Sequence, residues 1–239
     1  MDDLLALAIT AHGGMKRWDR ISRFRAAMSI TGAVWDLKGK PGLLTDVVLE
    51  GETRDQRIRI TPFPATGRYA TWEPVHQTIE TAQGVVVAER RNPAPSSSAP
   101  DQESPWDDLQ VATFAGQAIW NSLAAPFLFA RPDFVVQEID PWSNGGQVWR
   151  RLFVTYPDDV IAHSRQQTYY FDDDGCLRQL DYVVDILGGV PAVQYPSDYR
   201  QFDGIMVPTR RRAHVRNPDG SPLLHSTSVA IDVTRVAFD

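Results

Sequence analysis

The segment WDDLQVATFAGQAIWNSLAAPFLFA, residues 106–130, decides the fold of this chain. Large apolar residues recur in it with a period near 3.6, as at Leu109 and Trp120, which predicts a helix. Its apolar arc is wide, so we expect neighbouring elements to cover most of its sides. Pro126 is expected to kink the last turn, and Arg131-Pro132 to end the segment.

Most of the remaining chain is patterned like antiparallel β-strands. Apolar and polar residues alternate in runs such as QRIRI and VHQTIE. Turn-forming residues separate these runs: NGG at 144–146, DDDG at 172–175, DG at 203–204 and NPDG at 217–220. Such short connections favour neighbouring antiparallel strands. The expected strands include RFRAAMSITGAVWDL at 23–37 and CLRQLDYVVDIL at 176–187.

We therefore predict a mainly β (α+β) fold, in which a curved antiparallel sheet forms an unclosed barrel with a helix plug on its concave face. Residues 1–239 are expected to form a single half-barrel domain. A short helix is expected from Asp2 to His12, ended by Gly13-Gly14. The Pro- and Ser-rich stretch Asn92–Pro105 predicts a mobile surface loop, with a lid over a pocket mouth as the alternative.

The composition is that of an ordinary soluble globular protein, with 239 residues of which 43% are hydrophobic. The net charge of −6 argues against nucleic acid as a partner, because a basic surface would be expected there. A single cysteine, Cys176, excludes an internal disulfide and a cysteine-rich metal site. The five histidines show no HxH or HExxH spacing, so neither a metal site nor a cofactor is predicted.

The amino-terminal stretch MDDLLALAITAHGG lacks the basic region and the cleavage site of a signal peptide. Its apolar part is also too short to span a membrane. We therefore expect a cytoplasmic location and no stable insertion into a membrane. The oligomeric state is not predicted by any pattern in the sequence.

Aromatic residues are numerous and suggest the wall of a pocket for a hydrophobic small molecule. The candidate ligand-binding residues are Trp35, Trp72, Phe114, Trp120, Tyr169 and Tyr182. The alternative is that these rings only fill the core of the curved sheet.

Polar residues on two later strands are the candidates for catalysis. Alternation groups Asp181 with Asp185 on one strand face, and Arg210 with Arg212 and His214 on another, opposite Arg211. If the strands lie near each other, Asp181 or His214 would act as acid or base, and Arg210 or Arg212 would stabilise negative charge. The alternative is a solvated face held by surface salt bridges.

Four segments together resemble a bacterial family with the architecture of the lipoprotein-carrier-like (LolA/LolB-like) half-barrel superfamily. They are AHGG-x3-W at 11–18, the helix quoted above, YYFDDDGCLRQLDY at 169–182 and DYRQFDGIMVPTRRR at 198–212. The resemblance implies an unclosed antiparallel barrel, helices on its concave side and an apolar ligand held between them. We expect no signal peptide and no lipobox cysteine, in which the chain would depart from the superfamily, so periplasmic lipoprotein transport is not expected.

The sequence thus leaves three classes of function open. The first is a carrier or binding protein for a hydrophobic small molecule, which the aromatic content and the lack of a strong catalytic motif favour. The second is an enzyme, such as a cyclase, isomerase or hydrolase, acting on a lipophilic substrate in the same pocket. The third is an interaction module that uses an open sheet edge.

Overall fold

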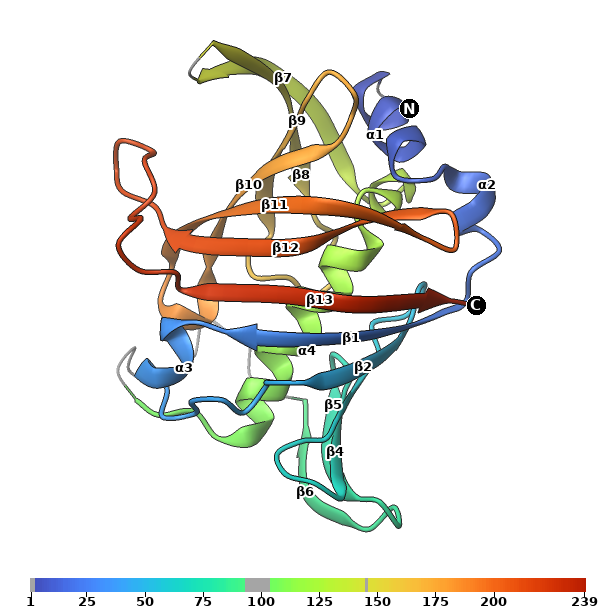
Figure 1. Ribbon diagram of the computed structural model, residues 1–239, viewed down its shortest axis with the longest axis vertical. Helices are drawn as coiled ribbons and strands as arrows, with labels where there is room; N and C mark the ends of the chain where they lie inside the picture. Colours follow the sequence, from blue (N-terminus) through green and yellow to red (C-terminus); the bar gives the residue numbers. More distant parts are fainter. Residues whose placement is uncertain (1–2, 93–103, 145) are drawn as a thin grey trace.

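The computed structural model of the protein describes residues 3–92, 104–144 and 146–239 (Figure 1). Within these residues, thirteen strands form one antiparallel sheet. The strands are β1 (Arg23–Thr31), β2 (Val47–Glu52), β3 (Ile58–Thr61), β4 (Arg68–Trp72), β5 (His76–Thr81), β6 (Val86–Arg91), β7 (Val135–Asn144), β8 (Gln147–Thr155), β9 (Gln166–Phe171), β10 (Leu177–Val184), β11 (Val190–Phe202), β12 (Ile205–Val215) and β13 (Val229–Phe238). The helices are α1 (Asp3–Ala11), α2 (Met15–Trp18), α3 (Ala33–Leu37) and α4 (Asp108–Ala124), with 3-10 turns η2 (Phe127–Ala130) and η3 (Asp185–Leu187).

Neighbouring strands of the sheet follow one another in the sequence, except that β1 lies next to β13. Its order is β6-β5-β4-β3-β2-β1-β13-β12-β11-β10-β9-β8-β7, so that β1 pairs with β13 at the centre while β6 and β7 are the two edges. The sheet curves around α4, which lies behind β11, β12, β13 and β1 in Figure 1. The predicted fold class, an unclosed antiparallel half-barrel with a helix on its concave face, is confirmed.

Helix α4 begins and ends where its local chemistry requires. Asp107 accepts a hydrogen bond from the backbone N–H of Gln110, and the Gln110 side chain accepts one from the backbone N–H of Asp107, which is a capping box. The helix ends at Ala124, because Pro126 cannot donate and disfavours a helical residue before it. It is therefore shorter than the predicted helical segment, and residues 127–130 form the separate turn η2.

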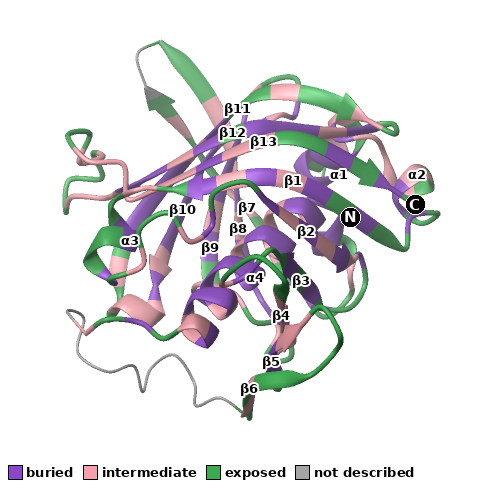
Figure 2. Ribbon diagram, turned by 60° about the horizontal axis from the view of Figure 1, so that its bottom comes forward, coloured by how far each residue is buried: buried purple, intermediate pink, exposed green. Residues whose placement is uncertain are grey.

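Small residues let α4 lie close to the sheet. Figure 2 shows most of α4 as buried, and a side chain at Gly116 would place its Cβ 2.9 Å from the Trp72 ring. Trp72 in turn is almost fully buried on β4. Sheet and helix thus form one continuous core. None of the described helices is long and apolar enough to cross a membrane.

Two of the predicted strands are wrong at their ends. Residues 33–37 form helix α3 and do not continue β1, because Gly32 turns the chain with φ 122° against the backbone of Ser228. Residues 185–187 form η3, so Asp185 no longer shares a strand face with Asp181.

The predicted amino-terminal helix is confirmed as α1, which is followed by Gly13 with φ 122°. Of the predicted mobile loop at 92–105, residues 93–103 lie outside the described residues.

Candidate functional site

An open groove of about 910 Å³ lies where α4 ends. It is bounded by α2, the β2–β3 and β4–β5 turns, η2 and residues 159–160. Its apolar lining side chains are Met15, Trp18, Pro74, Val75, Ala124, Phe127, Leu128, Ala130 and Val160. The rings of Trp18 and Phe127 stack with their centroids 4.4 Å apart and their planes at 8°, and both are buried. The groove therefore has an apolar, aromatic floor.

Polar side chains of the groove pair with one another and hold its walls. Arg57 lies 3.3 Å from Glu73, which links the β2–β3 turn to the β4–β5 turn. Gln56 donates to the carbonyl of Ile161 and accepts from its N–H, both at 2.7 Å. These contacts tie the β2–β3 turn to the β4–β5 turn and to the connection between β8 and β9, and so form the rim of the groove.

Two small cavities, of about 30 Å³ and 10 Å³, lie deeper between α4 and the strands β9 to β12. The larger is lined by polar side chains among others: Asn121, His163, Gln167, Tyr169, Tyr182, Gln194 and Arg211. Tyr169 and Arg211 also line the smaller cavity, together with Phe127. At these volumes each cavity accepts one to a few water-sized groups.

Arg211, on β12, points from the sheet toward α4. Its guanidinium donates to Oε1 of Gln194 at 2.9 Å and to the carbonyl of Ser122 on α4 at 3.0 Å. Burial lowers the pKa of this guanidinium, while the nearby hydroxyls of Tyr199, Tyr169 and Tyr182 act in the other direction. Among the described residues, no carboxylate lies within ion-pair distance of it. Arg211 is thus a buried cation with neutral partners only.

His163 lies beside Arg211 in the lining of the larger cavity. Its Nδ1 accepts a hydrogen bond from Nε2 of Gln117 at 3.0 Å, and its ring stacks on Tyr182 at 5.5 Å. Burial lowers the pKa of the half-buried His163 to about 4, so the imidazole is neutral near pH 7. Burial likewise raises the pKa of Tyr182 to about 12, which keeps its hydroxyl protonated. The cavity lining therefore contributes polar groups but no negative charge.

Asp181 lies on the opposite, convex face of the sheet. Its carboxylate accepts hydrogen bonds from Gln179 and from the hydroxyl of Tyr170, each at 2.8 Å, and pairs with Arg216 at 3.2 Å. The ring of Trp142 covers Tyr170 at 5.6 Å. Both oxygens of this buried carboxylate are thus occupied by protein groups.

The predicted catalytic residues share the convex face without forming one cluster. The register pairs Asp181 with Val193 and Val193 with His214, so Asp181 and His214 point to the same side, with β11 between their strands. His214 is hydrogen-bonded through Nδ1 to the carbonyl of Ser226. Arg212 pairs with Asp232 at 2.6 Å, and Arg210 lies 3.5 Å from Asp198 and 3.8 Å from Asp232. None of the four lines the three cavities described above, and their catalytic role stays a prediction.

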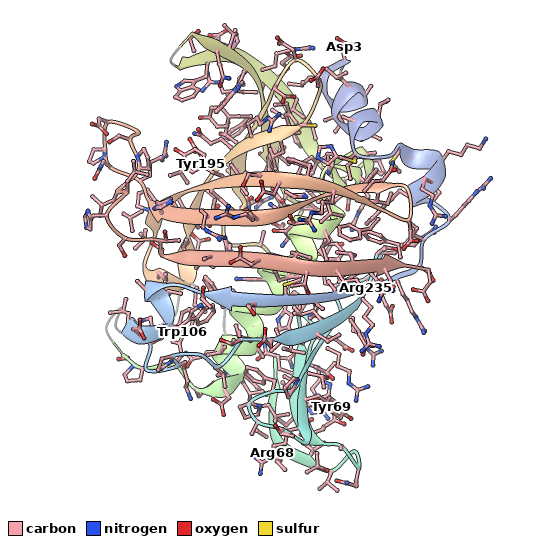
Figure 3. All side chains as sticks on the ribbon, viewed as in Figure 1. Asp3, Arg68, Tyr69, Trp106, Tyr195 and Arg235 are labelled. Carbon is pink, nitrogen blue, oxygen red and sulfur yellow. The ribbon has the colours of Figure 1, made fainter. Side chains whose placement is uncertain are left out.

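The predicted ligand-binding residues divide into two groups. Tyr169 and Tyr182 line the inner cavities. The other four lie in the core, outside the lining of the three cavities: Trp35, Trp72, Phe114 and Trp120. Trp35 packs on Phe114 and on Trp106, which Figure 3 labels, and Trp120 donates from its indole to the carbonyl of Glu52 at 2.7 Å.

Sequence reasoning missed Arg211, His163 and the groove. Strand alternation did place Arg211 opposite Arg210 and Arg212, and this was the available indication that one arginine of the run faces inward. His163 lies in the connection between β8 and β9, where no periodicity exists to orient a side chain. The groove is built from five separate segments of the chain, and their approach is a tertiary property.

No protein-family model matches the chain, and no curated protein matches it either. Several solved structures, however, match it in fold. A LolA superfamily protein from Nitrosomonas europaea matches with a TM-score of 0.53 at 12% identity, covering 97% of this chain and 93% of that one. A putative outer membrane lipoprotein-sorting protein domain from Vibrio parahaemolyticus matches with a TM-score of 0.54 at 12% identity, covering 98% and 92%.

A third structure broadens the comparison. A DUF1329 family protein from Desulfovibrio piger matches with a TM-score of 0.51 at 15% identity, covering 99% of this chain and 92% of that one. At these identities the likeness concerns the fold alone. The resemblance drawn from the sequence is confirmed at that level: the chain has the unclosed half-barrel of LolA-like proteins.

Proposed function

We propose that this protein is a carrier or binding protein that holds a lipophilic small molecule in the groove at the end of α4. The observation that carries this proposal is the combination of volume and lining. A volume of about 910 Å³ falls in the range of small-molecule sites, roughly 300–1,000 Å³. The stacked Trp18 and Phe127 provide the apolar floor that such a molecule needs.

The comparisons support the same proposal by analogy. One structural neighbour is described as a putative lipoprotein-sorting domain, and lipoproteins carry acyl chains. The groove, whose lining combines apolar side chains with charged ones such as Asp19, Arg54 and Asp159, gives this chain a place for a comparable molecule. The inner cavities are too small for one unless side chains move.

Native mass spectrometry of the freshly purified protein, followed by organic extraction, is the first test. The proposal predicts a lipophilic species bound at one per chain or, if the protein is purified empty, saturable binding of the neutral dye Nile red. A protein that neither retains a lipophile nor binds the dye would contradict the proposal.

A matched pair of variants then locates the site. Val75 lies in the groove lining and is 62% exposed, whereas Val85 is 60% exposed on the neighbouring hairpin and outside the lining. A carboxylate placed in apolar contact is costly, so Val75→Glu should weaken Nile red binding by about tenfold or more. Val85→Glu should leave it unchanged. Equal effects of the two substitutions would move the dye site away from the groove.

A further inference from the structure

Arg211 lacks the partner that a buried cation normally has. Charged side chains are rarely fully buried unless they are paired, because removing them from water is costly. Two neutral oxygens, from Gln194 and Ser122, accept from this guanidinium, and a guanidinium has more N–H donors than these two bonds use. The side chain also lines both inner cavities.

We infer that Arg211 binds the carboxylate of an amphipathic ligand whose apolar tail lies in the groove, as in a long-chain fatty acid. The inference rests on the proposed function and specifies its ligand class. The planar fork of arginine matches a carboxylate with two parallel hydrogen bonds. The larger cavity, at about 30 Å³, accommodates a group of this size and leaves little room for a bulkier head.

The surroundings of Arg211 favour an anion of this kind. His163 and Tyr182 line the same cavity in their neutral forms, so no protein anion competes for the guanidinium. Because Gln117 donates to Nδ1 of His163, the neutral imidazole carries its proton on Nε2, which is its one donor. A carboxylate at Arg211 would thus meet hydrogen-bond donors and no competing protein anion.

Phe127 connects the proposed head site to the groove. This side chain lines the groove on one side and the smaller inner cavity on the other, and Arg211 lines that same cavity. Trp18 stacks on the groove side of Phe127. A ligand with its carboxylate at Arg211 and its tail in the groove therefore has to displace the buried ring of Phe127.

The test compares hexadecanoic acid, hexadecanol and hexadecyl phosphate by calorimetric titration of the intact protein at pH 7.5. The inference predicts that the acid binds at least about tenfold more tightly than the alcohol, as a charge-assisted, bidentate contact should provide. This comparison uses the unmodified protein, so it does not depend on the folding of a variant. Equal binding of acid and alcohol would overturn the inference, as would tighter binding of the phosphate than of the acid.

Variants assign the effect to the residue. Arg211→Met should abolish the preference for the acid while leaving the affinity for the alcohol unchanged, and Arg211→Lys should retain part of the preference. Arg235→Met is the control, because Arg235 is exposed near the end of β13 (Figure 3). An acid preference that survives Arg211→Met would also overturn the inference.

The two proposals fail in different ways. If the alcohol binds and Val75→Glu weakens it, the groove is the site even when acid and alcohol bind equally. If none of the three compounds binds and Nile red does not bind either, the proposed function itself fails.

Discussion

The two faces of strands β9 to β12 bury charge in opposite ways. On the convex face, Asp181 has three protein partners, and the half-buried Arg212 has its own aspartate. On the concave face, one residue earlier in the same strand, Arg211 has neutral partners only. Adjacent arginines of one strand thus lie in different electrostatic surroundings, because alternation sends them to different sides of the sheet.

This difference separates a face on which the buried charge has a counter-charge from a face on which it has none. A buried ion pair whose lone pairs are occupied by protein groups contributes to the folded structure, and its loss is destabilising. A buried charge without a counter-charge gains from an added anion and loses little when it is replaced by an apolar side chain. The contrast can be tested by stability measurements that need no ligand.

The largest expected effect concerns His163 on the concave face. Its pKa is about 4 when folded and about 6.5 when unfolded, so the unfolded chain binds the proton more tightly. The free energy of unfolding should therefore fall as the pH drops from 6.5 to 4, by about 3 kcal/mol from this residue, and the loss should level off below pH 4. His163→Gln should remove about 2 kcal/mol of the loss between pH 7 and pH 5 in urea unfolding.

The exposed His225 provides the control for that measurement. His225→Gln should keep the full pH dependence of the unmodified protein. The buried His12, whose pKa is also lowered by burial, contributes equally in both variants. A His163→Gln protein with unchanged pH dependence would show that the imidazole is not buried as a neutral group.

The second prediction compares the two faces directly. Asp181→Asn removes the partner of Arg216, whose side chain is 32% exposed, so the full cost of a broken buried pair is reduced by solvent. We expect the free energy of unfolding to fall by about 2 kcal/mol. Arg211→Met should change it by less than about 1 kcal/mol, because loss of an unpaired charge offsets loss of two hydrogen bonds. Equal destabilisation by the two substitutions would contradict the view that the two faces differ in how their buried charges are compensated.

The smallest expected effect concerns the distance between α4 and the concave face. Gly116→Ala should improve helix propensity by about 1 kcal/mol, but the new methyl group would lie 2.9 Å from the Trp72 ring. Overpacking costs about 1–3 kcal/mol, so a net loss of about 1 kcal/mol is expected in urea unfolding. In a Trp72→Leu background the same substitution should be neutral or stabilising. The same loss in both backgrounds would mean that the helix does not rest on this ring.

Periodic patterns predicted the sheet and the helix, and they failed where a short segment changes direction. The run at 33–37 reads as a continuation of β1, because five apolar or acidic residues are too few to show a helical period. The predicted strand alternation likewise extended past Val184, although the strand ends there and η3 begins at Asp185. Alternation grouped the side chains within each strand, but only the register between the strands shows that Asp181 and His214 point to the same side of the sheet.

The candidate site was harder to predict from the sequence, because it depends on which face of the sheet receives α4. A run of three arginines in a strand indicates that one faces inward, but the apolar content of α4 does not reveal which one. The aromatic residues chosen as a pocket wall include four core residues, since rings fill a curved sheet whether or not it binds a ligand. The cytoplasmic location stays a prediction, because it was drawn from the sequence alone.

The pairing of β1 with β13 has a consequence for how the chain acquires its structure. Phe24 lies opposite Phe238, and the backbone of Ser22 donates to the carbonyl of Asp239 at 2.6 Å. The centre of the sheet is therefore completed by a pairing between the first and the last of its strands in chain order. Pairing across so long a separation is slow, because the chain must close a large loop before the contact forms. Until β13 is available, the edge of β1 stays unpaired, and unpaired strand edges are where partly folded chains aggregate.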